Sequence, residues 1–124
     1  MTEVTGVDHV QLDAPPGCEA EARAYFGALL GLEELEKPPR LATGGGVWFG
    51  LGSQALHVGV EPDFAPARKA HPALRVASVE ALDALAASLG DAGHAVVWAD
   101  PEEIPGTQRF FVDDPWGNRL ELLA

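Results

Sequence analysis

The sequence predicts an α+β fold built from two βαβββ modules. Segments with the two-residue alternation of strands and segments with the spacing of amphipathic helices follow one another in the order strand, helix, three strands, and this order occurs twice. Breaks rich in glycine and proline separate the segments. The length of 124 residues fits a single domain, because domains typically contain about 100–200 residues.

The first module is predicted at residues 5–61. Residues 7–12 alternate as in a strand, and residues 22–30 place apolar side chains at helical spacing. Gly31 follows directly, where the end of a helix favours glycine. Three further strands are predicted at residues 33–36, 47–51 and 56–60.

A connector at residues 62–70 leads into the second module, at residues 71–124. Its first strand is predicted at residues 71–76, and Ser78 is placed to cap a helix whose apolar side chains span residues 79–89. Three final strands are predicted at residues 95–98, 107–113 and 119–123, with a type I turn at residues 114–117 between the last two.

The charge balance limits the classes of partner. The chain has 19 acidic and 8 basic residues, and its net charge is −11. Nucleic acids and anionic membranes require clustered lysine and arginine, so we expect neither as a partner. The sequence has no apolar run of membrane-spanning length and no signal-peptide pattern. Because Cys18 is the only cysteine, no intrachain disulfide can form, and we expect a cytoplasmic protein.

Four polar residues occupy matched positions in the two modules. His9 and His71 open the first strands and lie 62 residues apart, while His57 and Glu121 lie on the last strands, 64 residues apart. Apolar neighbours flank each of them, so each side chain points away from the aliphatic face of its strand. Imidazole and carboxylate ligands suit Zn, Ni, Co, Mn or Fe(II). The spacing therefore predicts a divalent metal site with an open position for a ligand.

Two segments resemble a known family: VDHV at residues 7–10 and DDPWGNRLEL at residues 113–122. With them the chain resembles, over about residues 5–124, the vicinal oxygen chelate superfamily. This superfamily includes lactoylglutathione lyase (glyoxalase I), extradiol dioxygenases, fosfomycin-modifying thiol transferases and bleomycin resistance proteins. Its paired βαβββ modules form a half-open barrel around a divalent metal. The resemblance implies a ligand set of His9, His57, His71 and Glu121.

The resemblance also implies a metal-dependent, glyoxalase-like enzyme of lyase or isomerase type, in which the metal acts as a Lewis acid on a small oxygen-chelating substrate. His57 stands where the lyase usually carries a carboxylate, so it is a fourth ligand, a proton carrier or a residue that lines the pocket. Arg109 either anchors an anionic group of the substrate or forms a salt bridge. The expected substrate contacts are Gln11, Phe49, Trp98 and Arg109.

An alternative function is that of the bleomycin resistance proteins, which sequester a cationic or aromatic small molecule without a metal. The net charge of −11 agrees with a cationic ligand. A structural or regulatory role for a degenerate family member is a third possibility. In each case we expect a homodimer, because single-domain members of this superfamily generally pair.

Overall fold

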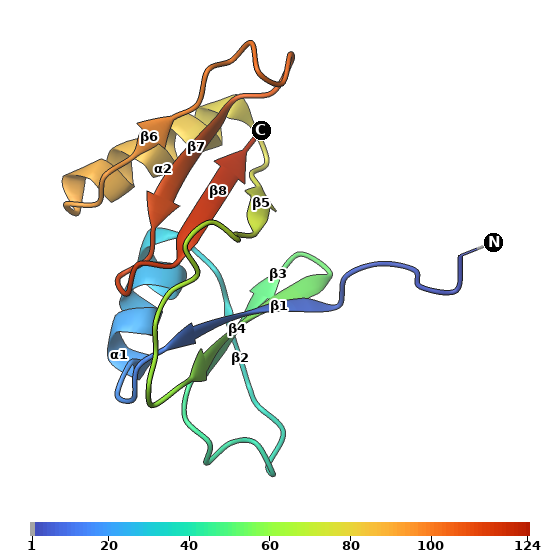
Figure 1. The fold of residues 1–124 in the computed structure, drawn as a ribbon, viewed down its shortest axis with the longest axis vertical. Helices are drawn as coiled ribbons and strands as arrows, with labels where there is room; N and C mark the ends of the chain where they lie inside the picture. The colour runs from blue at the N-terminus through green and yellow to red at the C-terminus, as the bar shows by residue number, and fades with distance from the viewer. Residues whose placement is uncertain (1) are drawn as a thin grey trace. The chain divides into compact units, whose positions relative to one another are not determined.

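The computed structural model describes residues 2–124, and its chain divides into two compact units, Met1–Ala65 (unit 1) and Pro66–Ala124 (unit 2). Each unit combines one four-stranded mixed sheet with one helical segment (Figure 1). The predicted α+β class is therefore confirmed. Within residues 2–124, none of the helices combines the length and the apolar character that a bilayer span requires.

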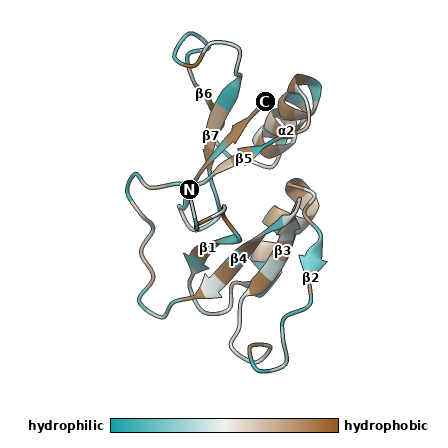
Figure 2. Cartoon of the chain, turned by 90° about the vertical axis from the view of Figure 1, so that its right-hand side faces the viewer, coloured by the Kyte–Doolittle hydropathy of each residue, from teal (hydrophilic) through white to brown (hydrophobic). Residues whose placement is uncertain are grey.

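Unit 1 has the element order predicted for the first module. Its elements are β1 (His9–Ala14), α1 (Glu19–Ala22), the π-helical segment η1 (Arg23–Leu29), β2 (Glu34–Leu35), β3 (Val47–Leu51) and β4 (Gln54–Val60). The strand order in the sheet is β1-β4-β3-β2, where β1 runs parallel to β4 and the other neighbours are antiparallel. In Figure 2, β3 and β4 are hydrophobic over part of their length, while the short edge strand β2 is hydrophilic.

Unit 2 repeats the topology of unit 1. Its elements are β5 (Ala73–Arg75), α2 (Val79–Asp91), β6 (Val97–Trp98), β7 (Arg109–Asp113) and β8 (Arg119–Leu123). The strand order is β5-β8-β7-β6, again with one parallel pair, β5 and β8. Two βαβββ modules are thus present as predicted, and in the part of the chain described here neither sheet closes into a barrel.

Aromatic side chains form the core of unit 1, between the helical segment and the sheet. Tyr25 and Phe26 of η1 are fully buried, and the ring of Phe26 lies 5.8 Å from that of Phe49 on β3. Gly31 adopts a φ of +74°, which confirms the predicted end of the helix. The backbone N–H of Leu30 donates to the carbonyl of Tyr25, five residues earlier. The second part of the helix is therefore π-helical, a detail that apolar spacing does not predict.

In unit 2, α2 packs beside the sheet (Figure 1). The helix begins as predicted, because the Ser78 hydroxyl accepts a hydrogen bond from the backbone N–H of Ala81 at 3.1 Å. Leu82 and Leu89 of α2 are fully buried, as is Phe110 of β7. The face of α2 that carries these leucines therefore covers the aliphatic side of the sheet, which leaves the opposite side of β7 and β8 for polar side chains.

A buried carboxylate organises the turn between β7 and β8. The backbone N–H of Gly117 donates to the carbonyl of Asp114 at 3.1 Å, as the predicted turn requires. The Asp114 side chain accepts from the backbone N–H of Trp116 at 3.0 Å, and from the backbone and side-chain N–H groups of Asn118, both at 2.8 Å. Burial raises the pKa of Asp114 above its ordinary value, although the hydrogen bonds from Asn118 oppose this shift.

Candidate functional site

The four predicted metal ligands lie in two clusters, one in each unit. The first cluster, here called the ring stack, consists of His9, His57 and Trp48 in unit 1. The second, here called the ion-pair chain, lies in unit 2 and runs through the Lys69 carbonyl, His71, Glu121, Arg109 and Glu103.

The ring stack crosses three neighbouring strands of the unit 1 sheet. His57 on β4 pairs in register with Trp48 on β3, and their rings are parallel within 1° with centroids 3.9 Å apart. The His9 ring lies on the other side of His57, 4.2 Å away and tilted by 18°. Sandwiched in this way, His57 is only 8% exposed, although it points away from the helix-covered side of the sheet.

The two imidazoles of the stack are in different electrostatic surroundings. The carboxylate of Asp8 lies 2.9 Å from Nδ1 of His9, so His9 donates its Nδ1–H there, and in the neutral ring Nε2 carries the lone pair. The pKa of His57 lies below its ordinary value, chiefly because burial disfavours the charged ring and secondly because His9 is close. The stack therefore provides a neutral imidazole, His57, beside one whose tautomer a carboxylate fixes.

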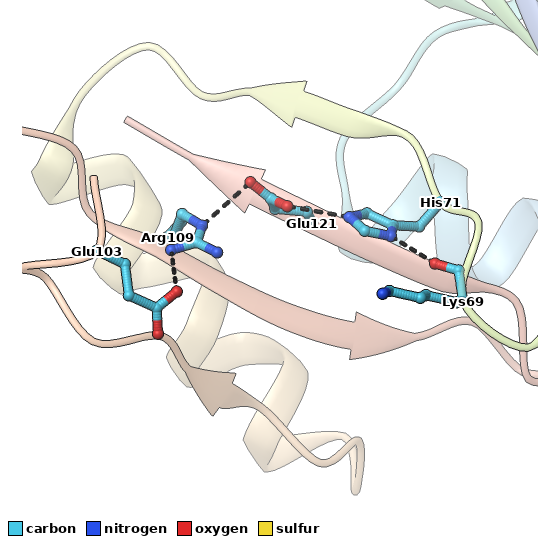
Figure 3. Close-up of polar contacts among 5 residues, drawn as sticks. All are labelled: Lys69, His71, Glu103, Arg109 and Glu121. Carbon is cyan, nitrogen blue, oxygen red and sulfur yellow. Dashed lines mark hydrogen bonds and ion pairs between the residues drawn. The ribbon is translucent and has the colours of Figure 1, made fainter.

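The ion-pair chain holds His71 and Glu121 face to face (Figure 3). Nδ1 of His71 lies 2.8 Å from the carbonyl oxygen of Lys69, which can only accept, so Nδ1 carries a hydrogen. Nε2 of His71 then lies 3.0 Å from Oε1 of Glu121. The other carboxylate oxygen accepts from Nε of Arg109 at 3.3 Å, and Nη1 of Arg109 donates to Glu103 at 3.2 Å.

The His71–Glu121 contact is a hydrogen bond of ordinary length between two groups of the kinds that also bind metals. A neutral imidazole with its hydrogen on Nδ1 presents a lone pair at Nε2, and the carboxylate oxygen presents another, so a proton or a cation must lie between them. Two ligands that each lie about 2.1 Å from one ion, at a right angle, are separated by about 3 Å. The side chains are 24% and 12% exposed, which keeps the pair accessible but held in place.

The structure thus pairs His9 with His57, and His71 with Glu121. Neither unit, over residues 2–124, gathers three or more His, Cys, Asp or Glu side chains that could hold a metal by themselves. Convergence of all four residues on one metal ion remains a prediction.

Two of the four predicted substrate contacts lie on the surface. Gln11 lies within β1 on the same side as His9, and its amide donates to Asp13 at 3.0 Å. Trp98 on the edge strand β6 is 46% exposed, and its ring meets that of Phe110 edge-on at 5.2 Å. Both side chains are accessible to a ligand.

The other two predicted contacts are engaged within the protein. Phe49 is fully buried and packs on Phe26, so we do not propose that it touches a substrate. Arg109 bridges Glu121 and Glu103, which is the salt-bridge alternative left open by the sequence. Arg109 donates its Nε hydrogen bond to the Glu121 carboxylate and so holds this side chain in place.

Sequence reasoning did not assign several residues that support these clusters. Asp8 was visible as the residue before His9, since a carboxylate often orients a histidine ligand. A tryptophan on a strand fits a core or a pocket equally well, and only the β3–β4 register places Trp48 on His57. Lys69 contributes a backbone carbonyl and Glu103 belongs to an irregular loop, so neither carried a sequence signal.

The chain is similar to proteins of one known family. Residues 7–122 match the family model described as Glyoxalase/Bleomycin resistance protein/Dioxygenase superfamily. A Bacillus anthracis protein described as a glyoxalase family member is 43% identical, with a TM-score of 0.89 over 99% of this chain and 97% of the other. No curated protein matches the chain.

More distant structures share the fold. A lactoylglutathione lyase from Agrobacterium tumefaciens is 21% identical, with a TM-score of 0.71 over 98% of this chain and 94% of the other. A fosfomycin resistance protein from Listeria monocytogenes is 15% identical, with a TM-score of 0.74 over 98% and 93% of the two chains. At these identities the likeness concerns the fold alone.

Proposed function

Because the chain belongs to the glyoxalase/bleomycin resistance protein/dioxygenase superfamily, we propose that it is a metal-dependent, glyoxalase-like enzyme of lyase or isomerase type. Its substrate would be a small molecule that presents two neighbouring oxygens. The observation that supports this proposal best is the approach of His71 Nε2 to Glu121 Oε1 at 3.0 Å, with the other nitrogen of His71 held by a carbonyl.

The donor set suits a divalent transition metal such as Zn, Ni, Co, Mn or Fe(II). His71 and Glu121 would hold the ion, with His9 as a third ligand whose tautomer Asp8 already fixes. When bound, such an ion acts as a Lewis acid that polarises a substrate carbonyl and stabilises an enolate.

The remaining residues of the two clusters have supporting roles in this proposal. Arg109 orients Glu121 through its Nε hydrogen bond, so that Oε1 faces His71. His57, whose pKa is lowered by burial in the stack, would accept a proton from a substrate carbon at a ring nitrogen. The same nitrogen could serve as a fourth ligand, and the effect of its removal on metal affinity separates the two roles.

Elemental analysis of protein purified without a histidine tag tests this function. We expect one divalent ion per chain, and prolonged treatment with a chelator should remove it. In calorimetry, the resulting apoprotein should bind one equivalent of the ion again. Failure to bind any of the five metals would overturn the proposal. Tight binding of a cationic glycopeptide by such a metal-free protein would instead establish the sequestering alternative.

The proposal includes a homodimer, expected from the superfamily. Sedimentation equilibrium at micromolar concentration should give about twice the chain mass of 13.0 kDa. A mass equal to that of one chain would remove the dimer from the proposal and leave the metal chemistry untouched.

A further inference from the structure

A cavity in unit 2 is lined by neither His71 nor Glu121. Its volume is about 550 Å³, within the range of about 300–1,000 Å³ that small-molecule sites occupy. It opens between residues 93–97, which lead from α2 into β6, and residues 111–115 of β7 and the following turn. Arg119 of β8 completes the wall.

The cavity results from the short length of β6. Val97 and Trp98 pair with Phe111 and Phe110, and the ladder then stops. A continued antiparallel register would place Ala95 opposite Asp113. The chain instead leaves the sheet before that point, and the gap beside the end of β7 is the cavity.

Arg119 is the cationic group in this wall that has no carboxylate partner. Its guanidinium lies 4.1 Å from the centroid of the Phe111 ring, a cation–π contact that fixes the side chain. Over residues 2–124 its guanidinium takes part in no side-chain hydrogen bond or ion pair, although the backbone of Arg119 belongs to the β7–β8 ladder. Arg109 on the neighbouring strand, by contrast, bridges two carboxylates. The five N–H donors of the Arg119 guanidinium are thus available to a ligand.

The acidic side chains of the cavity are already engaged. The Asp114 carboxylate accepts three N–H groups of its own turn. Asp113 lies opposite Arg119 in the β7–β8 register and has interaction partners of its own. Hydrogen-bonding capacity toward a ligand therefore remains on the guanidinium, and this favours an anion despite the negative net charge of the chain.

We propose that this cavity binds a small monocarboxylate with an aromatic or branched apolar body. The planar guanidinium fork of Arg119 matches a carboxylate, which can accept two parallel hydrogen bonds from it. The apolar body would contact Val97 and Pro115 in the same wall. Neither of the two proposed metal ligands of unit 2 lines the cavity, so the proposal does not depend on metal binding.

Titration of chelator-treated, 15N-labelled protein with benzoate tests the proposal by NMR. We expect shifts confined to residues 93–97 and 111–119, with a dissociation constant on the order of 1 mM, as suits a ligand of this size. Benzamide has the same shape without the charge, and it should bind at least about tenfold more weakly. Equal binding of benzamide, or stronger binding of the cation benzamidinium, would overturn the proposal.

Arg119→Gln should weaken benzoate binding by about tenfold or more, since it removes the charge and the fork. Arg119→Lys, which keeps the charge alone, should fall between the two. Arg75→Gln is the matched control, because it removes one charge from an exposed position on β5 of the same sheet. The proposed site would be contradicted if the parent protein did not bind benzoate. It would also be contradicted if the Arg119→Gln variant bound benzoate as tightly as the parent protein. Because the protein is metal-free throughout, failure of the proposed enzymatic function would leave this result standing.

Discussion

The ring stack of unit 1 and the ion-pair chain of unit 2 occupy matched places in the same topology but are held together by different forces. His57 on β4 and Glu121 on β8 are both paired in register with an aromatic residue, Trp48 or Phe111. The imidazole stacks on its neighbour and becomes neutral. A carboxylate cannot stack in this way, and Glu121 instead contacts Arg109 and His71.

This difference shows that the repeated backbone supplies positions and that the side chain on the last strand decides their chemistry. In unit 2 the carboxylate brings negative charge to the His71 contact, which favours a bound cation. In unit 1 the stack brings a desolvated ring that resists protonation. We therefore expect unit 2 to contribute most of the metal affinity and unit 1 to contribute the proton acceptor.

The largest expected effect follows from removing the unit 2 pair. If about 10–16 kcal/mol of metal-binding free energy is shared among four ligands, each contributes about 3 kcal/mol. His71→Ala and Glu121→Gln should then each weaken metal binding by roughly 100-fold or more in calorimetry with the apoprotein. His94→Ala, outside the matched positions, serves as the control. Equal affinities of the His71 and His94 variants would mean that the repeat does not form a metal site.

The second largest expected effect concerns the hairpin turns of the two units, which should contribute differently to the free energy of unfolding. Asp114→Ala removes three hydrogen bonds from the β7–β8 turn and leaves buried N–H groups without acceptors, so we expect a loss of about 2–3 kcal/mol in the free energy of unfolding. Ser53→Ala, in the exposed β3–β4 turn, should change it by less than about 0.5 kcal/mol. Urea denaturation measures both, and equal losses would refute the special role of the carboxylate.

Arg109→Gln tests whether the ion-pair chain positions Glu121. Groups that orient a metal ligand typically contribute 10–100-fold to affinity, and we expect a loss of about tenfold in metal binding by this variant. Glu103→Gln should change the affinity by less than about threefold, because Glu103 is exposed and its ion pair is screened by solvent. Unchanged metal affinity in the Arg109 variant would show that Arg109 does not position Glu121.

The smallest effect concerns the pH response of the ring stack in the apoprotein. The pKa of His57 is lower in the folded state than in the unfolded chain. As the pH falls, the unfolded chain therefore binds a proton at this histidine before the folded chain does. The free energy of unfolding should therefore decrease as the pH falls below about 6.5, the unperturbed histidine value. The measurement is urea denaturation at several pH values.

His57→Phe keeps a ring in the stack and should abolish this part of the pH dependence. Trp48→Leu removes one of the two rings that bury His57, so the histidine should titrate closer to its ordinary pKa in an NMR experiment. A His57 titration that does not differ between the parent protein and the Trp48→Leu variant would show that the stack does not cause the shift.

The sequence alone determined the elements and the faces of the strands. Residues 47–51 and 119–123 coincide with β3 and β8, because glycine or turn residues bound each alternating run sharply. Gly31 and Ser78 marked a helix end and a helix start correctly, since both depend on local backbone chemistry. The same alternation directed His57 and Glu121 away from the aliphatic faces.

Only the tertiary structure decided which side chains meet. Alternation gives the face of a strand but not its neighbour, and the parallel ladder between β1 and β4 joins residues that are distant in sequence. Strand pairing therefore had to form before His9 could stack on His57, or before Arg109 could bind Glu121 in preference to a substrate. The burial of Phe49 likewise depends on Phe26 of the packed helix, which alternation along a strand does not indicate. Local sequence sets the backbone preferences of each segment. The surroundings of a polar side chain depend instead on contacts with distant residues, which form only when the chain folds.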